Sequence, residues 1–177
     1  MSDFLELAKR RQSCRNYSDK PIAHETLEKI IEAARLTPSA CNSQPWRFVV
    51  AESPDVVAQL AKAGQQLGIN GFLAKAQAFV LVVEEYAVLM PRLRAFIDSQ
   101  YFAKGDLGAA AVSVCYAAAD LGLGSCIIGL YDREKIAQAL NLPLDKRFGA
   151  LIALGYPEDD TIRAKVRKDM GDVVRFV

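Results

Sequence analysis

Histidine and paired cysteines are almost missing from this sequence. Its 177 residues include one histidine, His24, and four cysteines that form no CxxC pair. Zinc sites of the Cys/His type need clustered ligands, so we expect no metal site. A Ser-His-Asp triad would have to use His24, which precedes an amphipathic helix and is expected at the surface. The GxSxG turn is also missing, so no pattern in the chain indicates hydrolysis.

The chain also lacks an excess of charge of one sign. Lys and Arg number 22 and Asp and Glu number 21, for a net charge of +1. That balance provides no overall field to attract nucleic acid or an anionic membrane surface, so neither is an expected partner. The start, MSDFLELAKRRQ, has charges where a signal peptide needs an apolar run,. We therefore expect a cytoplasmic protein with reduced thiols.

Long uninterrupted apolar runs are scarce as well. Residues 108–130 contain one charged residue, Asp120, and could span a bilayer in length, but small residues and glycines interrupt them,. We interpret this stretch as a buried helix followed by a turn. Among the cysteines, Cys115 and Cys126 are expected in the core. Cys14 and Cys41 lie in polar segments, where a reactive thiol is an alternative to a structural role.

Apolar periodicity predicts a single domain, residues 1–177, of the α+β class. Leu27, Ile30, Ile31 and Ala34 follow the spacing of an amphipathic helix, which should end before Thr37-Pro38,. Because helices and strands are mixed without strict βαβ alternation, α+β is favoured over a doubly wound sheet. The same patterns predict helices at 4–11, from Pro54 onward, at 106–121 and from Asp132 to 140, and strands at 46–50, 78–83, 126–129 and 148–155,.

No nucleotide-binding fingerprint is present. The glycine cluster at 122–129 has the spacing GxGxxxxG in place of GxGxxG, and it follows a helix instead of a first strand,. Leu130 stands where a phosphate-binding GxxxxGK[ST] loop requires lysine,.

Three polar clusters in expected loops are the candidates for function. Residues 10–17 combine three arginines with a serine, which suits a phosphate, although a solvated basic surface is the alternative,. In residues 37–46 small side chains would let a ligand approach the backbone, and Asn42 and Gln44 could read a heterocycle edge; a simple capping turn is the alternative. The third cluster is residues 122–129.

Together the clusters resemble the FMN-dependent nitroreductase family. The segments RRQSCRNYSDKPI, PSACNSQPWRFVV and GLGSCIIGLYD carry the resemblance, and FGALIALGYPEDD and RAKVRKDMGDVVRF extend it over nearly the whole chain. The resemblance implies a nitroreductase-like fold with a central mixed sheet flanked by helices. It also implies an intertwined homodimer with two FMN sites at the interface.

The resemblance assigns FMN contacts residue by residue. Arg11 and Ser13 would serve the phosphate and ribityl chain, Arg15 would face the N1/O2 side of the ring, and Gln12 stands where many relatives carry a basic residue. The other implied contacts are Pro38, Ser39, Ala40 and Asn42 from the partner subunit, Asn70 at the pyrimidine edge, Ile127, Ile128 and Gly129 near N5, and Lys165 and Arg167 at the phosphate.

The implied activity is a ping-pong oxidoreductase reaction. NADH or NADPH would reduce FMN, and a nitroaromatic, quinone or activated enone would then take the electrons. No side-chain acid or base is required, because the cofactor carries the chemistry. Alternatives are a flavin-fragmenting or dehalogenating relative, a non-catalytic flavin module and a structural dimer without flavin. A substrate lid would come from residues 86–104, whose short length favours an open cleft.

Overall fold

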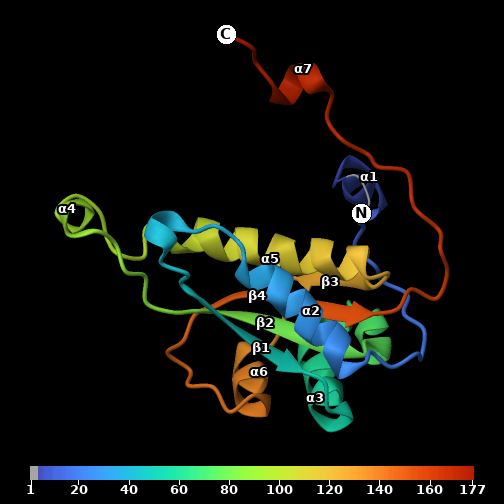
Figure 1. The fold of residues 1–177 in the computed structure, drawn as a ribbon. Helices are drawn as coiled ribbons and strands as arrows, with labels where there is room; N and C mark the ends of the chain where they lie inside the picture. Colours follow the sequence, from blue (N-terminus) through green and yellow to red (C-terminus); the bar gives the residue numbers. More distant parts are fainter. Residues whose placement is uncertain (1–3) are drawn as a thin grey trace.

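The computed structural model describes residues 4–177, and its centre is one four-stranded sheet (Figure 1). Its strands are β1 (Trp46–Ala51), β2 (Ala78–Glu84), β3 (Gly124–Ile128) and β4 (Phe148–Gly155), in the order β1-β2-β4-β3. The expected α+β class is confirmed, but the expected mixed sheet is wrong, because every pairing between these four strands is antiparallel. The chain leaves β1 after Ala51 and enters β2 beside it, with Ala51 paired to Phe79, so β2 runs back along β1.

Helices cover both faces of the sheet (Figure 1). On one face, α2 and α5 pack on Val80, Val82 and Ile152, and on the other, α3 and α6 pack on Phe79 and Leu81. The continuous apolar run at 78–83 follows from this arrangement, since every residue of β2 is buried,. The helices are α1 (Phe4–Arg10), α2 (His24–Arg35), α3 (Pro54–Gly64), α4 (Pro91–Arg94), α5 (Ala103–Asp120), α6 (Arg133–Ala139) and α7 (Met170–Val173), with 3-10 turns η1 (Ala40–Asn42), η2 (Gln66–Gly68) and η3 (Gly71–Lys75).

Most element boundaries agree with the sequence predictions. Helix α2 ends at Arg35, ahead of Thr37-Pro38, and the Asp132 carboxylate caps α6 by accepting from Lys135 N at 3.1 Å. Helix α5 begins three residues earlier than predicted. His24 lies at the surface, with its ring 2.9 Å from Glu52. Among residues 4–177, no helix is both long and apolar enough to cross a membrane.

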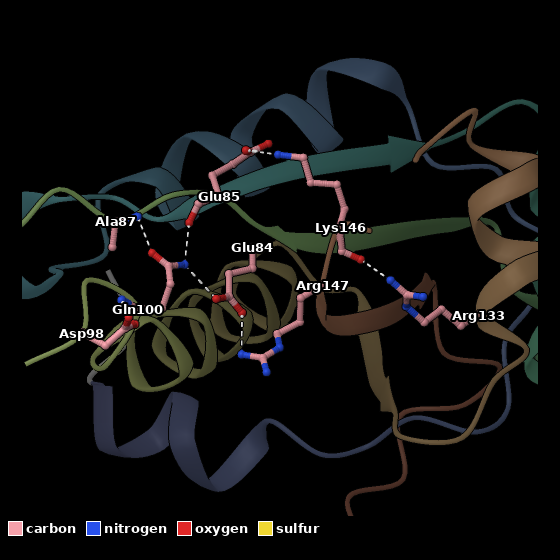
Figure 2. A network of polar contacts seen from close by, with 8 residues as sticks. All are labelled: Glu84, Glu85, Ala87, Asp98, Gln100, Arg133, Lys146 and Arg147. Atoms are coloured by element: carbon pink, nitrogen blue, oxygen red, sulfur yellow. Dashed lines mark hydrogen bonds and ion pairs between the residues drawn. The ribbon is translucent and has the colours of Figure 1, made fainter. Parts of the chain in front are cut away.

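The segment between β2 and α5 extends away from the body and is fastened at its base (Figures 1 and 2). The side chain of Gln100 donates to Glu84 Oε1 at 2.8 Å and to the Glu85 carbonyl at 3.0 Å. It also accepts from the backbone N–H of Ala87 at 2.6 Å. The Glu84 carboxylate is nearly buried and accepts in addition from Arg147 at 3.3 Å. The Gln100 side chain therefore ties the end of the segment 86–102 to its beginning, beside the end of β2.

The chain after β4 has no core of its own. In Figure 1 it runs past α1 and ends far from the sheet. Residues 158–177 are exposed with one exception, Lys165, which is half-buried. Val166, Phe176 and Val177 are at least 88% exposed. We call residues 158–177 the tail.

Candidate functional site

The first polar loop is joined to the edge of the sheet. Ser13 forms a parallel bridge with Ser125 of β3, and Cys14 N donates to the Ser125 carbonyl at 2.9 Å. Gly124 makes this approach possible, because a Cβ there would lie 2.5 Å from Cys14 Cβ and 2.7 Å from its Sγ. Gly124, in the third polar cluster, therefore leaves the space in which the loop of the first cluster packs against β3.

Five cations from two segments far apart in the sequence line one hollow of about 310 Å³. Arg11 and Arg15 come from the first loop, whereas Arg163, Lys165 and Arg167 come from the tail. We call this the cation hollow. Gln12 and Ser13 also line it.

Arg11 is only partly satisfied within the protein. Its Nε atom is buried and has no hydrogen-bond partner in the part of the chain that the structure describes. Its guanidinium carbon lies 5.6 Å from the ring centroid of Tyr116 on α5, within the range of a cation–π contact,. A buried donor without a partner is costly, so the geometry favours an anion at Arg11.

The ammonium group of Lys165 is held beside Arg11. Its Nζ donates to the Arg11 carbonyl. Desolvation lowers the pKa of Lys165, and the positive charges of Arg11, Arg167 and Arg163 lower it further. A bound dianion would reverse the electrostatic part of that effect, since an opposite charge favours the protonated amine.

The outer edge of β3 leaves backbone groups unpaired by the sheet. The Ser125 carbonyl accepts from Cys14 N, on the side away from β4. Leu154 of β4, which lies opposite Ser125, accepts from Gln77 N through its own carbonyl. Ser125 and Leu154 are therefore a non-hydrogen-bonded pair, and so, two residues on, are Ile127 and Ile152,. The backbone N–H and C=O of Ile127 thus face away from β4. Its side chain is 47% exposed, whereas that of Ile128 is buried.

Asn70 lies at the far end of this edge. Its side chain donates to the Gly64 carbonyl at 3.0 Å, and a Cβ on Gly64 would lie 3.9 Å from Ile128. Ser13 contacts β3 at Ser125, three residues earlier, or about 10 Å along a strand,. The structure therefore brings together the predicted residues of the first loop, the tail, Asn70, Ile127, Ile128 and the exposed Gly129 along one edge.

The loop of Pro38, Ser39, Ala40 and Asn42 lies elsewhere. Ala40 N donates to the Asp106 carboxylate at 3.3 Å, near the start of α5. Arg11 contacts Tyr116, ten residues later, and ten residues of helix span about 15 Å,. Within one chain, this loop therefore does not reach the cation hollow.

This second loop holds an uncommon backbone geometry. Cys41, Asn42 and Gln44 have φ of 55°, 50° and 48°, in the left-handed region that side chains other than Gly, Asn and Asp rarely adopt,. The Ser39 hydroxyl stabilises the turn by accepting from Gln44 N at 2.8 Å. Strained backbone of this kind tends to occur at functional sites.

The cysteines divide differently from the sequence-based expectation. Cys115 and Cys126 are buried as expected, but Cys14 is buried too. Burial raises the pKa of the Cys14 thiol, which disfavours a reactive thiolate there,. Cys41 is exposed on η1.

Sequence reasoning missed Arg163. Arg163 is the first residue of the segment RAKVRKDMGDVVRF, and its alternation with Lys165 and Arg167 was the signal that could have identified it. The structure places it in the cation hollow, where its guanidinium donates to the Ser13 carbonyl at 2.5 Å.

Known proteins resemble this chain over most of its length. The Nitroreductase family profile matches residues 8–69 and 59–156. An oxygen-insensitive NADPH nitroreductase of Helicobacter pylori is 30% identical, over 98% of this chain and 99% of its own. A protein of Archaeoglobus fulgidus, described provisionally as an NADH dehydrogenase/NAD(P)H nitroreductase, is 32% identical over 90% of this chain and 88% of its own. The chain belongs to the nitroreductase family.

Solved structures of nitroreductase proteins share the fold. A provisionally described nitroreductase of Exiguobacterium sibiricum in complex with FMN superposes with a TM-score of 0.85, at 24% identity, over 100% of this chain and 98% of its own. A nitroreductase family protein of Clostridium difficile 630 superposes with a TM-score of 0.79, at 26% identity, over 99% of this chain and 98% of its own. The family profile ends at residue 156, and the Helicobacter relative and these structures extend the similarity over the tail.

Proposed function

We propose that this nitroreductase-family protein is an FMN-dependent oxidoreductase that passes electrons from NAD(P)H to a nitroaromatic, quinone or activated enone. NAD(P)H and the acceptor would occupy the same cleft in turn, in a ping-pong cycle. The observation that carries the proposal is the cation hollow beside the free edge of β3. The names of the Helicobacter and Archaeoglobus relatives support the nicotinamide, and the Exiguobacterium complex supports FMN. We also propose a cytoplasmic location, where NAD(P)H is available.

The cation hollow suits the terminal phosphate of FMN. A phosphate monoester is close to a dianion at neutral pH and has three acceptor oxygens. Arg11 supplies a buried Nε that has no partner among residues 4–177, and Lys165 supplies an ammonium whose pKa is lowered by desolvation and by its cationic neighbours. Arg163 and Arg167 add two further cations. This concentration of positive charge in one hollow favours a bound anion.

The free edge of β3 suits the ring system. Ile127 directs backbone hydrogen-bonding groups outward, and Asn70 hydrogen-bonds Gly64, which lies close to Ile128. Ile128 is about 10 Å along the strand from Ser125, where the Ser13 bridge forms,. Arg15 is exposed beside Ser13, where the resemblance assigns it to the N1/O2 side of the ring. FMN, when bound, would supply the hydride chemistry, and these residues would orient it and favour negative charge at the ring.

The site is completed, in our proposal, by a second copy of the chain. Pro38, Ser39, Ala40 and Asn42 do not reach the cation hollow of their own chain, which agrees with the implied role of this loop in the partner's site. Phe4, Val112 and Tyr116 line an apolar hollow over α1 and α5 that a second subunit could fill. The exposed apolar residues of the tail also favour an intertwined homodimer.

Anaerobic titration tests the activity. The purified protein, saturated with FMN, should lose the yellow absorbance of the oxidised flavin on addition of NADH or NADPH, and regain it on addition of an acceptor. A non-catalytic flavin module would bind FMN without being reduced. A flavin-fragmenting relative would consume the flavin instead of recycling it. A protein that cannot be loaded with FMN would contradict the proposal.

Subunit complementation tests the shared site. Arg11→Ala and Asn42→Ala should each weaken both sites of their own homodimer. In a mixed dimer, one site would contain both changes and the other would contain neither. Activity should therefore recover when the two variants are unfolded and refolded together. Recovery that fails although mixed dimers form would contradict a site built from two chains.

A further inference from the structure

Gln12 makes its hydrogen bonds to the tail. Its Nε2 donates to the Thr161 carbonyl at 2.7 Å. Its Oε1 accepts from the backbone N of Arg163 at 3.2 Å and from the Nε of Arg163 at 3.1 Å. A glutamine amide has two donor hydrogens and one acceptor oxygen with two lone pairs. Both lone pairs and one of the hydrogens are therefore directed at residues 161 and 163.

Arg163 closes the contact from the other side. Its guanidinium donates to the Ser13 carbonyl at 2.5 Å, so the residue following Gln12 also binds the tail. We call the contacts of Gln12 and Ser13 with Thr161 and Arg163 the tail clasp. Two residues further on, Lys165 donates to the Arg11 carbonyl. The clasp and the Lys165 contact together hold five residues of tail against the first loop.

The clasp matters because little else in the structure fixes this part of the chain. Within residues 158–177 no residue is buried, and only Lys165 is half-buried. Ordering an exposed segment costs conformational entropy that local contacts must offset. Arg163, Lys165 and Arg167 line the same hollow, so holding Arg163 in place also keeps the other two tail cations beside the first loop.

We propose that Gln12 is a positioning residue, which holds the tail so that its cations line the phosphate hollow, and that it is not a phosphate ligand. This inference rests on the proposed function in one respect: the anion in the hollow is the FMN phosphate. It also gives a reason for a neutral amide where many relatives carry a basic residue. Lysine at position 12 could donate to the Thr161 carbonyl, but it has no acceptor for Arg163 and would add a sixth cation to the hollow,.

Two substitutions at position 12 separate positioning from direct binding. Gln12→Ala removes the clasp without changing the charge, and Gln12→Lys removes its acceptor while adding a positive charge. If Gln12 positions the tail, both variants should raise the FMN dissociation constant, by about tenfold for the loss of two or three hydrogen bonds. If Gln12 binds the phosphate directly, Gln12→Lys should bind FMN at least as tightly as the unaltered protein, which would overturn the inference. Gln59→Ala, an exposed change on α3, is the control.

Hydrogen exchange supplies a readout that does not depend on FMN. In the protein without FMN, backbone amides of residues 161–167 should exchange faster in Gln12→Ala than in Gln59→Ala. Unchanged exchange would overturn the clasp, whatever happens to affinity. If the unaltered protein fails to bind FMN while exchange still responds to Gln12→Ala, the proposed function fails and the clasp survives. Arg163→Ala should cost less affinity in the Gln12→Ala background than alone, because coupled residues are not additive.

Discussion

Lys165 donates through its ammonium group to the backbone carbonyl of Arg11, 154 positions earlier in the sequence. This contact brings two cations side by side in a chain whose net charge is only +1. Desolvation lowers the pKa of Lys165, and repulsion from the positive charges of Arg11, Arg167 and Arg163 lowers it further. An anion bound between these cations would relieve that repulsion.

Affinity for FMN should depend on pH in two opposite ways. As pH increases through about 6, affinity should rise, because the phosphate loses its second proton and becomes a dianion. In alkaline solution it should fall, because Lys165 has a lowered pKa in the free protein and a bound dianion raises that pKa again,. Binding therefore favours the protonated amine, and this contribution is lost as pH rises from the free to the bound pKa. Fluorescence titration across the pH range measures both limbs.

The substitution Lys165→Arg is the matched control for the alkaline limb. A guanidinium stays protonated throughout the range, so the variant should keep its affinity where the unaltered protein loses it. An identical alkaline decline in both proteins would remove Lys165 as its cause.

Arg11 and Arg15 should affect different properties of the bound flavin. Arg11 is assigned to the phosphate, whose charge is the same in both redox states, so Arg11→Ala should raise the dissociation constant with little change in midpoint potential. Arg15 is assigned to the ring, where negative charge develops on reduction. A hydrogen bond to a charged group is worth about 1.5–3 kcal/mol, and about 30 mV corresponds to 1.4 kcal/mol for two electrons. Arg15→Ala should thus lower the potential by roughly 30–65 mV.

Potentiometry on FMN-saturated variants, with parallel binding titrations, separates these effects. A shifted potential in Arg11→Ala with an affinity change alone in Arg15→Ala would show that the two assignments are reversed. If neither variant changes either quantity, the first loop is not a flavin loop.

Truncation before Val173 should weaken subunit association and FMN retention together. The deleted residues include Phe176 and Val177, whose exposure of 89% and 109% in one chain favours a partner surface. Interfaces of obligate dimers commonly exceed about 2,000 Å² in total. Light scattering at decreasing concentrations, with measurement of bound flavin, checks the prediction. A truncated protein that remains dimeric and retains FMN would show that the end of the tail has no such role.

Gln100→Ala should loosen the segment 86–102 while leaving the sheet intact. The change removes the contacts to Glu84, Glu85 and Ala87 and leaves the buried Glu84 carboxylate with Arg147 alone (Figure 2). The free energy of unfolding should fall by about 1–3 kcal/mol. Limited proteolysis should cleave within 86–102 faster than in the Gln59→Ala control. Equal cleavage rates would mean that Gln100 does not fasten the segment.

Local sequence patterns predicted the elements well, because they record which faces are buried. The spacing of Leu27, Ile30 and Ala34 matches the face of α2 that packs on the sheet. Asp132 was identifiable as a helix cap since its carboxylate acts within four residues. Strand direction was not identifiable in this way: periodicity says which residues of β2 are buried, but the return of the chain beside Ala51 depends on the path through α3.

The site was predictable only in pieces. The first loop and the tail were recognised by resemblance, but the tail clasp joins residues about 150 positions apart and has no local signal. Cys14 was placed in a polar loop where a reactive thiol stayed possible, and it is buried because Gly124 leaves room for it against β3. The second loop and the cation hollow are separated because they lie at opposite ends of α5. The sequence predicted this helix but did not indicate which loops contact its two ends.

The central claim is that this chain forms a flavin site reduced by nicotinamide. The most direct measurement is an anaerobic titration of the FMN-saturated protein with NADH and with NADPH, followed spectroscopically. We expect full bleaching of the flavin by about one equivalent of at least one nicotinamide, and full return of colour on addition of a quinone. A flavin that stays oxidised with excess of both nicotinamides would contradict the account.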